Sequence, residues 1–202
     1  MAATRGEVLG HGTRKVESKR SYNCDSFGKM RAQERSLRLA ATEYIGKRIY
    51  FVTVCTEGRA KHFVDTTLGR WIAEKLVSKA ARQQFLVHAY CVMPDHLHFV
   101  VEGTEEYSNL IRFVERFKQE TAYEFSKTRA MRLWQHRYYD HILRRANELE
   151  DVACYVWWNP VRQGLCGEPG EYPLSGSLTI DWMIRGRKRG EWKPVWKQGA
   201  CS

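Results

Sequence analysis

The sequence lacks any long apolar run, and this absence argues against a membrane-spanning helix. No stretch of its 202 residues approaches the roughly 20 consecutive apolar residues that cross a bilayer. The segment from Met1 to Glu7 also lacks the apolar core of a signal peptide. We therefore expect a cytoplasmic protein.

Paired cysteine motifs are missing as well. Six cysteines are present and none forms a Cys-x-x-Cys pair: Cys24, Cys55, Cys91, Cys154, Cys166 and Cys201. A reducing cytoplasm disfavours disulfides, so we expect free thiols. The zinc-finger interpretation loses its main support.

Acidic residues are in the minority. Lys and Arg number 33 against 23 Asp and Glu, which gives a formal charge of +10 and a pI near 9.4. This surplus favours a polyanionic partner and argues against a protein specialised for acidic proteins or neutral metabolites. Nucleic acid is the first candidate, and an anionic membrane surface is the second.

The chain shows no internal repeat, and its length suits one domain with tails. Residues 1–43 carry nine Lys/Arg against five Asp/Glu with little periodicity, which predicts a flexible basic arm or a solvated tail without function. Residues 44–177 form the expected folded domain. Residues 178–202 are again basic and contain tryptophan, so we expect a second flexible tail that binds nucleic acid or aids solubility.

Hydrophobic patterning predicts an α+β fold. Strands are expected at residues 49–55, 85–92, 96–101 and 134–143, with helices from Asp65 to Arg82, from Ser108 onward, and from a capping box at Asn147 and Glu150 to near Pro160. The first strand is rich in β-branched and aromatic residues and should be buried on both faces. The order β-α-β-β-α-β-α indicates a ferredoxin-like antiparallel sheet with helices on one face.

The pentapeptide from Pro94 to His98 carries a possible metal site. In a strand, residues two apart project from the same face, so His96 and His98 stand side by side while Leu97 points to the opposite face and can be buried. Two neutral imidazoles supply half of a metal site, although a His-x-His pattern alone also suits ordinary polar-face histidines.

The last predicted helix places Tyr155 and Asn159 one turn apart on one face, together with Val152 and Val156. A tyrosine hydroxyl can act as a covalent nucleophile, and an amide oxygen can be a third ligand beside two histidines. A core tyrosine and a helix-ending asparagine explain the same residues. Tyr138 and Tyr139 compete with Tyr155 as nucleophiles on these grounds.

Three runs of the sequence resemble REP-associated tyrosine transposases, which belong to the single-tyrosine branch of the HUH endonucleases. They are residues 90–98, 133–141 and 155–165, in that order, within a resemblance that spans residues 44–177. The resemblance implies an HUH nuclease core in which His96 and His98 bind the metal, Tyr155 is the nucleophile and Asn159 completes the metal site. His141 lies in one motif without an assigned role and is interpreted as structural. Bulky Trp157 and Trp158 between Tyr155 and Asn159 depart from the family pattern.

The activity implied by the resemblance is cleavage and transfer of single-stranded DNA. Mg²⁺ or Mn²⁺ would polarise the scissile phosphate of a hairpin-type repeat, and the tyrosine would form a 5′-phosphotyrosine intermediate. Partners would be single-stranded or hairpin DNA without a membrane, and the protein would be nucleoid-associated and a monomer rather than a homodimer. Exposed tryptophans could stack on bases, with five candidates: Trp134, Trp157, Trp158, Trp192 and Trp196.

Two other functions fit parts of the sequence. A domesticated, non-catalytic protein that binds DNA hairpins would need the basic charge but not the tyrosine. A metal-dependent hydrolase of small phosphate esters would need the histidine pair, but neither Tyr155 nor the basic ends.

Overall fold

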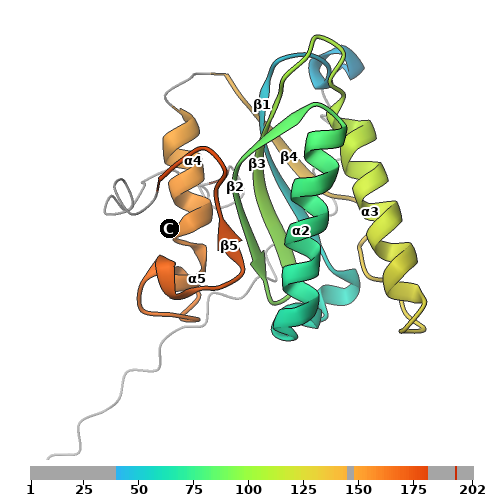
Figure 1. Ribbon diagram of the computed structural model, residues 1–202, viewed down its shortest axis with the longest axis vertical. Helices are drawn as coiled ribbons and strands as arrows, with labels where there is room; N and C mark the ends of the chain where they lie inside the picture. Colours follow the sequence, from blue (N-terminus) through green and yellow to red (C-terminus); the bar gives the residue numbers. More distant parts are fainter. Residues whose placement is uncertain (1–39, 145–147, 182–193, 195–202) are drawn as a thin grey trace, which may run out of the picture. The chain divides into compact units, whose positions relative to one another are not determined.

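The computed structural model describes residues 40–144, 148–181 and 194, and its centre is an antiparallel sheet (Figure 1). The sheet order is β4-β1-β3-β2-β5. Every neighbouring pair is antiparallel. The strands are β1 (Ile49–Cys55), β2 (Phe85–Met93), β3 (His96–Gly103), β4 (Tyr139–Leu143) and β5 (Ser175–Gly176). The predicted α+β class and ferredoxin-like antiparallel sheet are confirmed.

Helices cover both faces of the sheet. The α-helices are α2 (Thr66–Arg82), α3 (Leu110–Ser126), α4 (Glu148–Trp157) and α5 (Asn159–Arg162), with 3-10 turns at η1 (Ala41–Tyr44), η2 (Glu57–Arg59), η3 (His62–Val64) and η4 (Pro169–Glu171). Figure 1 shows α2 and α3 on one side of the sheet and α4 on the other. The expectation that all helices share one face was therefore wrong.

The reason for the second layer lies in the strands themselves. Six of the seven residues of β1 are buried, so the strand needs apolar cover on both faces. One core joins Leu97, Phe99 and Val101 to residues of α2 and α3. The other joins Phe51 and Val100 to residues of α4. Strand alternation thus places the two histidines of β3 on the α4 side, opposite Leu97.

The fourth strand is shorter than predicted. Thr53 pairs with Tyr139 at the start of β4, but Thr56 bridges Trp134 instead of His136, so the register slips by two residues. The Lys118 ammonium donates to the carbonyl oxygens of Gln135 and His136, each at 2.8 Å. These two carbonyl groups bind the Lys118 side chain of α3, and the regular pairing of β4 with β1 begins only at Tyr139.

Helix starts were predicted with mixed success. Asp65 caps α2 as expected, because its Oδ1 accepts from Thr67 N at 3.0 Å and Leu68 N at 3.2 Å. Asn109, not Ser108, caps α3 by accepting from Arg112 N at 3.0 Å. The predicted cap at Asn147 lies outside the described residues.

The structure describes only some of the cysteines and little of the two chain ends. Within the described ranges, Cys55, Cys91, Cys154 and Cys166 are free thiols. Cys24 and Cys201 lie outside those ranges, as do most of the predicted arm and tail. No helix in the described part of the chain is both long and apolar enough to cross a membrane.

Gly103 at the end of β3 gives a test of this packing. A Cβ atom there would overlap the carbonyl oxygen of Gly46 and lie 2.8 Å from Ser108 Cβ. Backbone atoms cannot move aside cheaply, so we expect Gly103→Ala to destabilise the protein by about 2–3 kcal/mol. Thermal or urea unfolding measures this. Gly170→Ala is the control, because nothing lies within 4 Å of its Cβ position, and an equal loss in both variants would contradict the packing.

Candidate active site

The β2–β3 hairpin is held to the end of β1, and this attachment positions the histidines. Its two-residue turn, Pro94–Asp95, is bound through its carbonyl oxygens. Thr56 N donates to Asp95 O at 3.0 Å and Phe63 N donates to Pro94 O at 2.9 Å. The strand that follows the turn begins at His96. The histidine pair thus lies at a fixed corner of the sheet.

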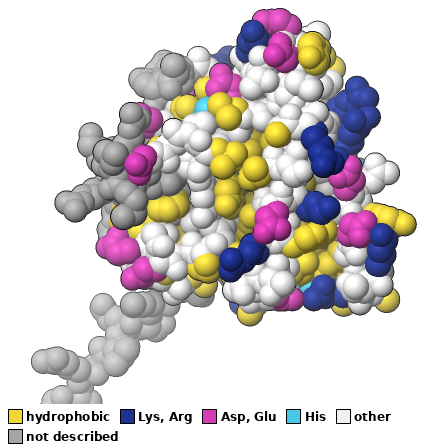
Figure 2. Space-filling model, in the orientation of Figure 1, with side chains coloured by type: hydrophobic (Ala, Val, Ile, Leu, Met, Phe, Trp, Pro, Cys, Tyr) yellow, Lys and Arg dark blue, Asp and Glu magenta, His cyan; other side chains and the backbone are white. Residues whose placement is uncertain are grey.

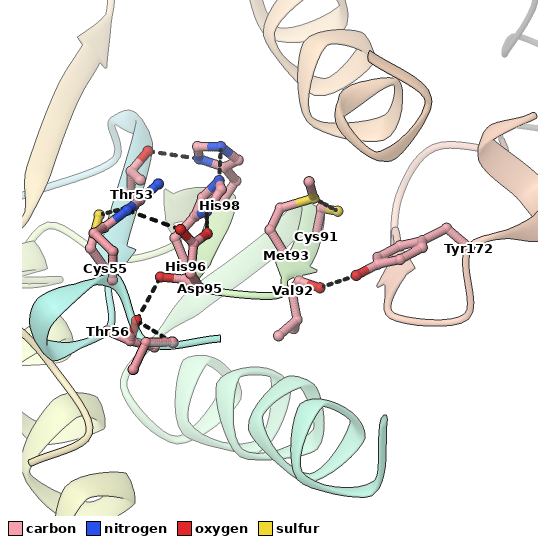
Figure 3. Close-up of polar contacts among 12 residues, drawn as sticks. Thr53, Cys55, Thr56, Cys91, Val92, Met93, Asp95, His96, His98 and Tyr172 are labelled. Carbon is pink, nitrogen blue, oxygen red and sulfur yellow. Dashed lines mark hydrogen bonds and ion pairs between the residues drawn. The ribbon is translucent and has the colours of Figure 1, made fainter. Parts of the chain in front are cut away.

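The two imidazoles point toward each other (Figure 3). His96 Nε2 and His98 Nε2 are 2.9 Å apart, and both side chains are buried. On the far side of each ring, Nδ1 has its own partner. Asp95 Oδ1 lies 2.5 Å from His96 Nδ1, and Thr53 Oγ1 lies 2.7 Å from His98 Nδ1. Both rings are therefore held by Nδ1 with Nε2 directed into the shared space.

These partners bear on which ring nitrogen carries the proton. An ionised carboxylate only accepts, so Asp95 places the proton of His96 on Nδ1 and leaves the Nε2 lone pair available. The Thr53 hydroxyl can donate or accept, so His98 can adopt either tautomer. With Thr53 accepting from Nδ1–H, both Nε2 lone pairs converge on one point.

Asp95 is itself fixed by a cation. Burial alone would raise the pKa of Asp95, but the hydrogen bond with His96 and the charges of His96 and Arg59 outweigh it and lower the pKa. The Arg59 Nε atom lies 3.1 Å from Asp95 Oδ2. Arg59 has a left-handed backbone with φ of 60°, which a residue with a Cβ seldom adopts, and this bend carries its side chain to Asp95. The carboxylate therefore stays ionised beside His96.

Tyr155 lies across from the histidines on α4. Its ring centroid is 6.0 Å from that of His98 and 5.9 Å from that of Phe51, in edge-on contacts. The guanidinium carbon of Arg162 lies 4.4 Å from the Tyr155 ring centroid, and Arg162 also donates to the Tyr155 carbonyl oxygen. The tyrosine is 2% exposed, so its ring is held in place on the histidine side of the sheet with a cation against one face.

Asn159 lies one turn beyond Tyr155, as the first residue of α5. The side chain is 1% exposed, and its Nδ2 atom has no hydrogen-bond partner among the described residues. A buried N–H donor without a partner costs free energy, and a ligand with an acceptor atom would satisfy it. The four residues predicted to share one helical face, Val152, Tyr155, Val156 and Asn159, are all buried.

The histidine pair fits a divalent ion. Two ligands that bind one ion at about 2.1 Å and at right angles are about 3 Å apart, which matches the 2.9 Å between the Nε2 atoms. Among the described residues, no group of three His, Cys, Asp or Glu side chains could hold a metal. Any further protein ligand would therefore be of another type, and Asn159 has a suitable amide oxygen.

The other residues named in the sequence analysis lie in the packing around the site or outside the described residues. Tyr138 packs on the α2–α3 core, while Tyr139 lies on the histidine side with its ring 6.1 Å from Phe51. His141 pairs with Phe51 in the sheet, and burial lowers its pKa. Among the stacking candidates, Trp134 and Trp158 are 6% and 7% exposed and are not available to a base, Trp157 is half-buried, and Trp192 and Trp196 lie outside the described residues.

Sequence reasoning gave no role to the residues that hold the histidines. Thr53 carries the only aliphatic hydroxyl of β1, and it lies opposite His98 in the register. That isolated hydroxyl was a signal available in the sequence. Asp95 was visible beside His96 but had no assigned partner, and Arg59 could not be found because its approach depends on a left-handed turn.

A His-x-His pair on a central strand, with a helix-borne tyrosine on the same face of the antiparallel sheet, is the arrangement of an HUH endonuclease of the single-tyrosine type. The IS200-like transposase family matches residues 45–158, which is more than half of the chain. The chain belongs to this family.

Similar proteins agree with this assignment. The REP-associated tyrosine transposase of Escherichia coli strain K12 is 23% identical over 151 residues, covering 69% of this chain and 87% of that protein. A Haemophilus influenzae protein is 24% identical over 144 residues, covering 63% of this chain and 78% of its own length. A solved REP-associated tyrosine transposase, bound to a REP hairpin, superposes with a TM-score of 0.58 and 20% identity, covering 75% of this chain and 88% of that one. The last likeness shows that the fold is shared.

Proposed function

We propose that this transposase is a metal-dependent endonuclease and strand transferase for single-stranded DNA that forms a 5′-phosphotyrosine intermediate. One observation carries the proposal: His96 and His98 direct their Nε2 atoms at one point, on the face of the sheet where Tyr155 lies 6.0 Å from His98 between ring centroids. Metal, nucleophile and substrate would meet there within one chain. This supports a monomer with its active site in cis.

The residues present suit the proposed reaction. Tyr155 Oη attacks the scissile phosphorus, and a new O–P bond forms as the bond to the 3′ oxygen breaks. The tyrosine loses its proton, and the departing oxygen ends as a 3′-hydroxyl. When bound at His96, His98 and Asn159, Mg²⁺ or Mn²⁺ would withdraw charge from the phosphate. Arg162 lies against the tyrosine ring and adds positive potential where the phenolate forms.

The reverse reaction needs no energy source. A phosphotyrosine ester replaces a phosphodiester of similar energy, so the 3′-hydroxyl of the same or another strand can attack it and release Tyr155. Phe51, His98 and Arg162 hold the Tyr155 ring in place, so a 3′-hydroxyl that stays bound beside the ester would be well placed to attack it. Joining can therefore compete with hydrolysis.

The proposed substrate is hairpin DNA with a single-stranded flank. The chain carries a formal charge of +10, which suits a polyphosphate, and the structurally similar REP-associated transposase was solved with a REP hairpin. Figure 2 shows that Lys and Arg alternate with Asp and Glu over α2 and α3, so that face is of mixed sign. We therefore place the DNA on the histidine side rather than on α2 and α3.

A covalent adduct tests the proposal. The full-length protein is incubated with hairpin DNA bearing a labelled single-stranded flank and Mn²⁺, then denatured and separated by size. We expect a label that remains on the protein with Mn²⁺ and is absent with EDTA. Cleavage that proceeds without any adduct would favour simple hydrolysis. Binding without cleavage across a panel of repeat sequences would favour the non-catalytic hairpin-binding protein.

Asp95 provides a separate prediction about the metal. Asparagine keeps the shape of the side chain but loses the charge that orients His96 and pairs with Arg59, so we expect Asp95→Asn to weaken Mn²⁺ binding about 10- to 100-fold. Mn²⁺ titration followed by electron paramagnetic resonance measures this without DNA. Asp151→Asn, on the exposed surface of α4, is the control. Unchanged Mn²⁺ affinity in Asp95→Asn would show that the carboxylate does not prepare His96.

A further inference from the structure

A segment that carries Arg137 and is hydrogen-bonded to its neighbours lies near the candidate site and has no role in the chemistry described so far. It comprises residues 134–138 and runs beside the end of β1 before β4 begins; we call it the bulged segment. Gln135 N donates to Cys55 O at 2.9 Å, and Trp134 Nε1 donates to Thr121 Oγ1 at 2.8 Å. With the two bonds from Lys118, these contacts attach the segment to both β1 and α3.

The bulged segment presents two side chains on the histidine side of the sheet. Gln135 lies next to Cys55, which pairs with His96 in the β1–β3 register. Tyr138 packs on the α2–α3 core, and neighbouring residues of an extended chain point to opposite faces, so Arg137 lies on the face of His98. Adjacent strands are about 4.8 Å apart, which places Gln135 about 10 Å from His96.

The charge of this segment is not neutralised by the rest of the described structure. Between Glu124 and Asp140 the sequence contains no acidic residue. Arg137 is exposed and forms no ion pair with any described residue, whereas Arg48, Lys79 and Arg129 each have a carboxylate partner. The half-buried amide of Gln135 likewise has no hydrogen bond within the described ranges. Both groups are free to bind a ligand.

We propose that Gln135 and Arg137 bind the DNA backbone at the phosphate next to the scissile one. A strand whose scissile phosphate lies at the histidine pair would pass over β1 toward the bulged segment. Its next phosphate would come within reach of the long arginine side chain. Arginine supplies a charged fork that matches phosphate oxygens, and the glutamine amide can donate to the same group or to a base. This assignment rests on the proposed function and adds a contact between the protein and its DNA substrate.

DNA binding without metal tests this assignment apart from cleavage. Fluorescence anisotropy in EDTA compares a hairpin carrying a single-stranded flank with the same stem lacking it. We expect Arg137→Ala to bind the flanked hairpin about 5- to 10-fold more weakly and to lower the salt dependence by about one phosphate contact. Binding of the bare stem should be unchanged, and Arg137→Lys should recover most of the affinity.

Two further variants make the comparison specific. Gln135→Glu puts a negative charge at the same place, so we expect it to weaken binding of the flanked hairpin at least as much as Arg137→Ala. Arg116→Ala, an exposed arginine on α3 without an ion pair in the described structure, should leave both DNAs unaffected. Equal losses on the flanked and bare hairpins, or an equal loss in Arg116→Ala, would overturn the assignment.

The outcomes separate this assignment from the proposed reaction. Wild-type protein that binds the flanked hairpin through Arg137 but forms no adduct with Mn²⁺ would remove the covalent mechanism and keep the contact. Wild-type protein that forms the adduct while Arg137→Ala binds normally would remove the contact and keep the mechanism. Failure of the wild type to bind either DNA would overturn both.

Discussion

Tyr155→Phe should form no covalent adduct with DNA, a loss of at least about 10³-fold, while the fold and DNA binding persist. Phenylalanine keeps the ring contacts with Phe51 and His98 and the packing of the Arg162 guanidinium against the ring. We therefore expect the structure to be unchanged. Only the hydroxyl that would attack phosphorus is removed. The adduct assay with Mn²⁺ and labelled hairpin DNA measures the loss, and circular dichroism verifies the fold.

Tyr138 and Tyr139, the two tyrosines in the run of residues 133–141, serve as matched controls. Tyr138 packs on the far side of the sheet, beneath the Lys118 ammonium, whereas Tyr139 lies on the histidine side against Phe51. We expect Tyr138→Phe and Tyr139→Phe to form the adduct at a level close to that of the wild type. An adduct that persists in Tyr155→Phe and disappears in Tyr139→Phe would identify Tyr139 of β4 as the nucleophile.

His96→Ala and His98→Ala should each lower Mn²⁺ affinity by about 100-fold or more. Either change removes one of the two Nε2 atoms proposed as ligands, which lie 2.9 Å apart, and the remaining imidazole with an amide oxygen would make a weak site. The partners of the lost ring, Asp95 Oδ1 or Thr53 Oγ1, would also lose their hydrogen bond. Mn²⁺ titration by electron paramagnetic resonance or calorimetry measures the affinity directly.

Metal-free DNA binding serves as the internal control for both histidine variants. We expect it to remain within about twofold of the wild type, because the proposed backbone contacts, such as those of Gln135 and Arg137 on the bulged segment, do not involve the imidazoles. His136→Ala, an exposed histidine on the bulged segment, should keep wild-type Mn²⁺ affinity. Mn²⁺ bound equally well by wild type, His96→Ala and His98→Ala would place the metal elsewhere in the protein.

Much of the fold could be predicted because the strong signals were local. The apolar run Ile49–Cys55 and the Asp65 cap gave β1 and the start of α2 to within a residue. The start of β4 could not be predicted, because it depends on Lys118 of α3 reaching two carbonyl groups of the bulged segment. The position of α4 on the second face follows from tertiary packing, since periodicity defines a buried stripe but not the sheet face that it meets.

In the candidate site, too, local features could be predicted from the sequence and distant contacts could not. Strand alternation alone placed His96 and His98 together and Leu97 on the opposite face, and the structure confirms this. Spacing left Tyr138, Tyr139 and Tyr155 as equal candidates. The family resemblance selected Tyr155, and its ring contact with His98 supports that choice. The Thr53 hydroxyl stands out within its strand, but its pairing with His98 and the approach of Arg59 to Asp95 depend on the tertiary fold.

The most direct test is to identify the residue that carries DNA in the covalent complex. Wild-type protein trapped on hairpin DNA with Mn²⁺ is digested with protease and nuclease, and the nucleotide-bearing peptide is sequenced by mass spectrometry. We predict a single modified peptide with a phosphotyrosyl nucleotide on Tyr155, joined through the 5′ phosphate. Modification at Tyr138, Tyr139 or a residue of another type would contradict the proposed active site.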